Sequence, residues 1–254
     1  MKKYAQFIAF VIMAVFSHTF VSCGDNDDEP KITYNNITMD CKTTHTIKGD
    51  DSWTSSNKYI ASVSGNTLTA ERVGKAIISS KNNSFTVTVT PTVSVFKEPC
   101  LEWGASKSRV KSFMSGYTLD KEMTNQLNYK GTGALILATY NFQNDGLSGA
   151  AIGLNGDYVN SEALSEQMTQ YYIPIEVDQS NYSFYFITPD EKTLVLLKLA
   201  SSGSTIIYAI VYVPRSNSSS RATSEDLETI ISTIGISASG NPSEKFNEMK
   251  SHLF

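Results

Sequence analysis

The side chains that could carry nucleophilic or metal chemistry are few in this sequence, and their spacing matches no common site. The cysteines and histidines are Cys23, Cys41, Cys100, His18, His45 and His252. Zinc ligands usually come in closely spaced pairs, and a Ser-His-Asp triad needs a histidine on the folded scaffold. The motifs Gly-x-Ser-x-Gly and His-Glu-x-x-His are also missing from the sequence. We therefore predict no catalytic residue, no metal site and no cofactor.

Paired carboxylates are the other chemistry to consider, because glycoside hydrolysis uses two acids held a few ångströms apart on a rigid scaffold. The acidic candidates in the expected second domain, after residue 100, are Glu102, Asp120, Glu122, Asp145, Asp157 and Glu176. Each lies beside an expected turn or helix end, where solvated or capping acids are ordinary. The sequence therefore favours a protein that is not an enzyme, with a glycan-acting hydrolase as the less favoured alternative.

Tyrosine is abundant in the second half of the chain and offers a surface for binding. Tyr208 and Tyr212 lie in the run "TIIYAIVYV", where the two-residue period of a strand puts both on one face. They fit two interpretations: half-buried tyrosines of an amphipathic sheet, or a stacking surface for a glycan or peptide.

The first 22 residues predict a secretion signal. Met1-Lys2-Lys3 is a positive start, and residues 7–16 form an apolar run. This run is too short to cross a bilayer, which takes about twenty residues.

Cys23 ends this leader, in the sequence Phe20-Val21-Ser22-Cys23. It resembles the lipobox of bacterial lipoproteins, although Phe20 stands where the family usually has Leu. The resemblance implies cleavage after Ser22 and lipidation of Cys23, which becomes the first residue. Two or three acyl chains would then anchor the protein in the membrane.

Residues 23–30 form an acidic tether that contains Asp25, Asp27, Asp28 and Glu29. Such a run stays solvated because like charges repel and nothing apolar can be buried. It lacks the glycine and the distal glutamate of an EF-hand calcium loop. It is similar to the acidic export signal of surface lipoproteins in some Gram-negative bacteria. We therefore expect a lipid-anchored outer-membrane protein, exposed at the cell surface.

The net charge limits the kinds of partner to expect, and two cysteines remain to be considered. The formal net charge is −4 and there is no basic patch, so no nucleic acid partner is expected. Cys41 and Cys100 would lie in an oxidising compartment, where a disulfide between them and two buried free thiols are both open interpretations.

Residues 31–91 contain seven short alternating runs separated by turn residues, which predicts a small β-sandwich. The expected core is Trp53, Ile60, Val63, Leu68, Ala76, Ile78, Phe85, Val87 and Val89. The stretch from Trp53 to Ser80 resembles the bacterial Ig-like domain, group 2. The matching residues are Trp53, Ser55, Ser56, Asn57, Ala61, Val63, Gly65, Leu68, Thr69, Ala70, Val73, Gly74, Ala76 and Ile78. The resemblance implies a spacer or adhesion module without catalytic residues.

Residues 92–100 are expected to be a Pro-bounded linker, and residues 101–236 an α+β domain of antiparallel sheet with packed helices. A helix capped by Ser106 precedes two β-β-β-α units, whose helices begin near Ser161 and near Thr223 or Ser224. Residues 237–254 are expected to be a frayed tail, with docking of Phe246, Met249 and Phe254 left open. This domain resembles those of uncharacterised secreted lipoproteins of gut bacteria, for which no activity is implied.

The sequence as a whole thus predicts a mostly β protein with an N-terminal Ig-like β-sandwich followed by an α+β domain. The expected function is a lipid-anchored, cell-surface binding or adhesion module for a glycan or a protein. The alternative is a structural or assembly lipoprotein that faces the periplasm.

Overall fold

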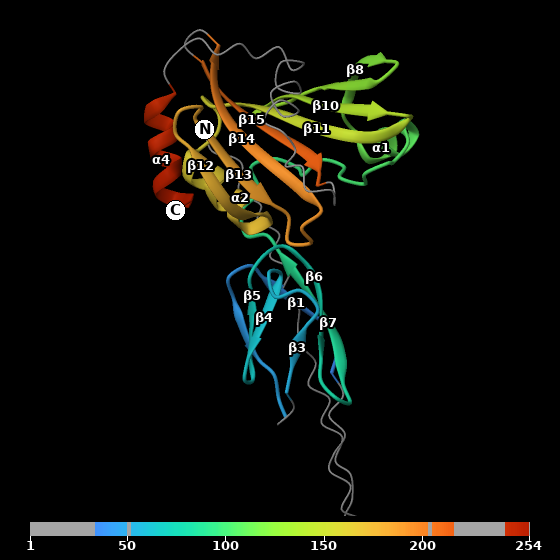
Figure 1. Cartoon of the computed structure of the whole chain (residues 1–254), viewed down its shortest axis with the longest axis vertical. Helices are drawn as coiled ribbons and strands as arrows, with labels where there is room; N and C mark the ends of the chain where they lie inside the picture. The colour runs from blue at the N-terminus through green and yellow to red at the C-terminus, as the bar shows by residue number, and fades with distance from the viewer. Residues whose placement is uncertain (1–33, 50–51, 203–204, 216–241, 254) are drawn as a thin grey trace, which may run out of the picture. The chain divides into compact units, whose positions relative to one another are not determined.

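The computed structural model describes residues 34–49, 52–202, 205–215 and 242–253, and the fold is mostly β, as predicted (Figure 1). The chain from Thr33 onward forms one compact unit. The leader, Cys23 and the acidic run lie outside the described residues, as does the helix predicted to begin near Thr223. Within the described ranges, no helix has both the length and the apolar character that crossing a membrane requires.

Each of the seven runs predicted before residue 91 forms a strand, and the strands make two sheets. One sheet has the order β1-β7-β6-β3, made of Ile37–Asp40, Ser84–Thr90, Gly74–Ser79 and Thr54–Ser55. The other has the order β2-β5-β4, made of Thr44–Thr46, Thr67–Ala70 and Ala61–Ser64. β1 pairs with β7 in parallel, and the other pairs in these two sheets are antiparallel.

The alternating strands bury one face of each sheet in a common core. β7 shows this most clearly, because Phe85, Val87 and Val89 are buried while the threonines between them are not. The predicted core residues are all buried except Val63, which is partly buried against the same cluster. Gly74 in β6 has a positive φ of 149°, and a Cβ there would lie 2.8 Å from Ile60 Cδ1, so the close packing requires glycine.

In the described residues after the sandwich, the strands form one eight-stranded antiparallel sheet with the order β12-β13-β14-β15-β11-β10-β9-β8. The first four strands are β8 to β11, Thr118–Met123, Gln126–Lys130, Leu135–Gln143 and Gly146–Asn155. The last four are β12 to β15, Ile173–Asp178, Ser183–Ile187, Thr193–Ser202 and Thr205–Pro214. Each group is a meander, and the two meanders join where β11 pairs with β15.

The sequence predicted three strands in each of the two β-β-β-α units. The structure has four strands in each, so the prediction missed one strand per unit. The missed strands, β8 and β12, are the two edges of the sheet. β8 is exposed along almost its whole length, so the alternating pattern that reveals a half-buried strand is absent from it. β10 and β11 are joined by a tight hairpin turn, in which Asn144 and Asp145 both have positive φ.

One face of this sheet and three helices of the described ranges enclose the main core. The helices are α1, Lys107–Phe113, α2, Ser161–Tyr171, and α4, Ser243–Leu253. Figure 1 shows α2 and α4 beside β12 and β13, and α1 beside β10 and β11. Ser106 caps α1 as predicted, since its side chain accepts a hydrogen bond from Arg109 N. A row of residues paired across five strands, Ala138, Ile152, Ile210, Leu197 and Phe184, lies on the helix-covered face.

The expectation of a frayed C-terminal tail was wrong. Residues 243–253 form α4, whose buried side chains Phe246, Met249 and Leu253 belong to the main core cluster. The Phe246 ring stacks on Phe184 with centroids 4.6 Å apart. These apolar residues recur at the three- and four-residue spacing of a helix face, which explains why this polar-looking segment folds.

Candidate functional site

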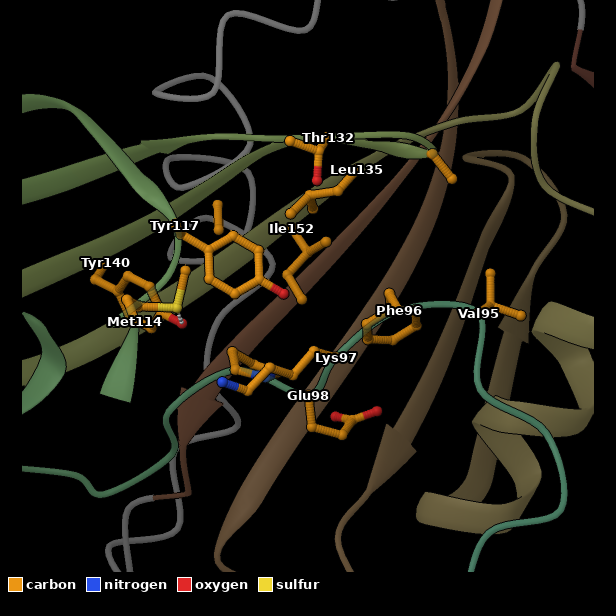
Figure 2. Close-up of a pocket in the computed structure, with 13 residues that line it drawn as sticks. Val95, Phe96, Lys97, Glu98, Met114, Tyr117, Thr132, Leu135, Tyr140 and Ile152 are labelled. Atoms are coloured by element: carbon orange, nitrogen blue, oxygen red, sulfur yellow. Dashed lines mark hydrogen bonds between the residues drawn. The ribbon is translucent and has the colours of Figure 1, made fainter. Parts of the chain in front are cut away.

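A pocket of about 180 Å³ lies beside the main core and is the candidate binding site. Figure 2 shows its walls. One wall is the extended segment from Val95 to Pro99, and others come from Met114 and Tyr117 near the end of α1 and from strands β10 and β11. The floor is formed by the most buried lining residues, Met114, Ala138, Tyr140 and Ile152, and is apolar apart from the Tyr140 hydroxyl group.

The segment that forms the first wall is held by two buried glutamines of α2. Gln167 accepts a hydrogen bond from Phe96 N and donates one to Phe96 O, at 3.2 and 2.9 Å. Gln170 accepts from Thr92 N and donates to Thr92 Oγ1, at 2.9 and 2.7 Å. An extended segment has no backbone partners of its own, so these amides satisfy groups that would otherwise be buried without a hydrogen bond.

Residues 92–100 have no strand or helix, which agrees with the linker prediction, but the segment is also a packed part of the fold. Phe96 and Cys100 are buried in the main core, and the segment is packed rather than solvated. Pro91 and Pro99 do exclude regular structure at the two ends, as expected. The segment between these two prolines is a wall of the site, and not a free connector between two independent parts.

The aliphatic part of the Glu98 side chain lines the pocket, whereas its carboxyl group points into the core. Gln167 Nε2 donates to Glu98 Oε1 at 3.1 Å, and the Tyr172 hydroxyl donates to Glu98 Oε2. Tyr212 Oη lies 3.4 Å from Tyr172 Oη. In Figure 2 the Glu98 carboxyl group points away from Tyr117 and Lys97.

The protonation of this cluster is shifted by its surroundings. Burial raises the pKa of Glu98 to about 7, although the hydrogen bonds from Tyr172, Gln167 and Tyr212 act in the opposite direction. Burial also raises the pKa of Tyr172 and Tyr212 well above the ordinary tyrosine value, so both remain phenols. Glu98 is thus a partly buried acid that changes its charge near neutral pH.

Lys97 supplies a positive charge at the rim of the pocket. Its ammonium group donates to Phe113 O at 3.2 Å and lies 4.4 Å from the centroid of the Phe113 ring and 5.6 Å from that of Tyr117. The side chain is exposed, and no carboxylate of the described ranges forms an ion pair with it. The aromatic rings and one carbonyl therefore position the charge without neutralising it.

The proposed tyrosine surface on β15 is not present. Tyr208 and Tyr212 both have 0% of their surface exposed, and both belong to the main core. The Tyr208 hydroxyl lies 2.9 Å from Ser161 Oγ at the start of α2. β15 is a central strand whose tyrosine face is covered by helices, so neither residue can stack on a ligand, and the half-buried interpretation also underestimated their burial.

The disulfide interpretation is also not supported, because Cys41 and Cys100 are free thiols in two different core clusters. Cys41 Sγ donates to Glu71 O at 3.1 Å. Burial raises the pKa of both thiols, which keeps them protonated and unreactive.

The acids considered for paired-carboxylate chemistry do not gather at the pocket. Glu102 pairs with Arg109 and Glu122 pairs with Lys111, and both pairs are exposed. Glu98 was not among the sequence candidates and is the acid that lines the pocket. Its position between the apolar residues Phe96 and Cys100 was the signal that could have identified it. Within the described ranges, no cluster of three or more potential ligands could hold a metal ion.

Comparison with known proteins adds no identification. No protein-family model matches this chain, and no curated protein matches it significantly. The likeness of residues 31–91 to bacterial Ig-like domains therefore stays a prediction from the residues quoted above.

Proposed function

We propose that this chain is a lipid-anchored binding protein of the bacterial outer membrane, exposed at the cell surface and not an enzyme. In this proposal the lipid on Cys23 holds the protein in the membrane. The acidic run and the sandwich of residues 34–90 separate the binding part from the bilayer. The pocket beside Lys97 is the binding site, and its ligand is a group carried by a glycan or a protein.

The observation that supports the proposal best is the composition of the pocket. Ligand sites are typically concave and mostly apolar, with a few polar groups that fix the orientation of the ligand. Here buried Met114 and Ile152 form an apolar floor, while Lys97 and Tyr117 supply polar groups above it. The buried amides of α2 hold the wall in place, so the pocket does not have to be built when a ligand arrives.

A pocket-blocking variant tests this proposal. Ala134 lines the pocket, is only partly buried and can carry a larger side chain. We expect the full chain to bind at least one member of a glycan and protein array, and Ala134→Phe to reduce that binding at least tenfold. Ile77→Phe, at an exposed site on β6, is the control and should bind as the native chain does. If Ala134→Phe and Ile77→Phe bind equally well, the pocket is not the binding site.

The anchor has its own test. Cys23→Ala removes the acceptor of the lipid, so the protein should move from the membrane fraction to the soluble fraction of lysed cells. Western blotting of the two fractions measures this, with Cys41→Ala as the control that should stay membrane-bound. If the Cys23→Ala protein remains in the membrane, the anchor proposal fails.

Protease treatment of cells that carry the native chain then tests which side of the membrane the protein faces. Protease added to intact cells should digest a surface-exposed protein. Protection of the protein until the cells are lysed would contradict surface exposure and favour the periplasm-facing assembly alternative.

A further inference from the structure

We propose that the pocket beside Lys97 binds the C-terminal residue of a peptide or protein that ends in an apolar amino acid. The apolar side chain of that residue would enter the pocket and its carboxylate would meet Lys97. This inference rests on the proposed function, because it takes the same pocket as the binding site and adds the chemical class of the ligand.

The charge of the ligand follows from the groups that face the pocket. Lys97 brings a positive charge to the rim that no acid of the described ranges pairs with. The one acid in the lining, Glu98, has its carboxyl oxygens engaged by Gln167 and Tyr172 on the far side of the wall. The pocket is therefore complementary to an anion, and a carboxylate can form a charge-assisted hydrogen bond with an ammonium group.

Two further donors line the same pocket. Figure 2 shows the Tyr117 hydroxyl pointing toward the space bounded by Ile152, Phe96 and Lys97. Within the described residues, neither the Tyr117 hydroxyl nor the Thr132 hydroxyl has a hydrogen-bond partner, although both residues line the pocket. Each can donate to an oxygen of the ligand at the rim.

The size and polarity of the floor define the other end of the ligand. A volume of about 180 Å³ corresponds to about six water molecules, which is room for one apolar side chain and not for a longer segment. The floor residues Met114, Ala138 and Ile152 are each at most 4% exposed and offer no charge. A sugar ring, with hydroxyl groups around its edge, would leave those groups unpaired against this floor.

The charged rim and the buried apolar floor are separate parts of the pocket, and this separation favours the C-terminal residue of a peptide as the ligand. Lys97 and Thr132 are exposed at the rim, whereas the apolar floor is buried. In a C-terminal residue, the carboxylate and the preceding chain leave the same carbon atom as the side chain. When the side chain points to the floor, both groups remain at the rim, where the charge is met and the chain can continue into solvent.

Isothermal titration of the full chain with two synthetic peptides tests the inference. Both have the sequence Gly-Ser-Gly-Ser-Leu, one with a free C-terminal carboxylate and one with a C-terminal amide. We expect the carboxylate form to bind at least tenfold more tightly than the amide. In Lys97→Met, which keeps the apolar stem and removes the charge, the two peptides should bind equally. Lys121→Met, at an exposed site on β8 away from the pocket, is the matched control and should keep the tenfold difference.

Each other outcome is decisive. Equal affinity of the two peptides for the native chain would overturn the role of the carboxylate, and an undiminished difference in Lys97→Met would overturn the role of Lys97. If N-acetyl-leucine binds as tightly as the peptide carboxylate, the terminal residue alone carries the recognition, as the inference requires. If no peptide binds while the array above gives a ligand that Ala134→Phe loses, this inference fails and the proposed function stands.

Discussion

Replacing Glu98 with glutamine is expected to raise the free energy of unfolding by about 3 kcal/mol at pH 8 and to leave it almost unchanged at pH 4. The reason is that the folded protein holds a proton on Glu98 up to a pKa of about 7, whereas the ordinary pKa of a glutamate is 4.5. Between these two pH values the folded state binds more protons at this site than the unfolded state. The stability of the native chain therefore falls as the pH rises through this window, and it stays at the lower level above it.

Glutamine imitates the protonated form, which is why the variant avoids this loss. Its amide oxygen can accept from Gln167 or Tyr172, and the side chain has nearly the same shape. Urea denaturation at several values from pH 4 to pH 8 measures the effect as the difference between variant and native chain. This difference should be small at pH 4, grow through the window and level off above pH 7.

Glu102→Gln is the matched control for this experiment. Glu102 is paired with Arg109 at an exposed site, and the hydrogen bond from Arg109 lowers the pKa of its carboxyl group. This substitution should cause a small loss of stability at neutral pH, opposite in sign to the effect at Glu98. A Glu98→Gln difference that does not change with pH would show that Glu98 is not the partly buried acid described above.

Phe246→Ala is expected to lower the free energy of unfolding by about 3–5 kcal/mol, the usual range for removing a buried aromatic ring. Phe246 is 2% exposed, stacks on Phe184 and meets the edge of Tyr182 at a centroid distance of 5.5 Å. Its loss would leave a cavity between α4 and the sheet. Urea denaturation at pH 4 is suitable because Glu98 is then protonated in both proteins.

Asn247→Ala is the matched control for Phe246→Ala. Asn247 is the next residue of the same helix and is exposed, so its replacement should change stability by less than about 0.5 kcal/mol. If residues 237–254 were a frayed tail, the two substitutions would have equally small effects. The size of the difference therefore measures how firmly α4 is docked.

The sequence predicted the inner strands well because their environment is simple. Strands such as β7 alternate between core and solvent, and this alternation is visible without knowledge of the fold. The edge strands β8 and β12 escaped prediction because one of their neighbours is solvent, which relaxes the demand for apolar residues. The same reasoning misjudged Tyr208 and Tyr212, since a single strand does not reveal whether helices cover its face.

The pocket could not be predicted from spacing, because its parts come together only in the folded chain. Lys97 and Glu98 lie in a segment without regular structure, which the proline pattern identified but could not place. Gln167 and Gln170 are long polar residues on a helix, and such residues are usually solvated. Their burial follows from the backbone groups of residues 92–96 that they satisfy, and these partners are about seventy residues away in sequence.

The seam between β11 and β15 also has a consequence for the order in which the protein folds. Within each meander, neighbouring strands are joined by short turns, whereas the seam pairs Ala150 with Tyr212. Closing so long a loop costs more chain entropy than closing a hairpin, so each meander forms more readily than the seam. Tyr212 comes from the second meander, while most of the pocket wall comes from residues before it. The contact of Tyr212 with Tyr172 beside Glu98 is therefore completed only when the two halves join.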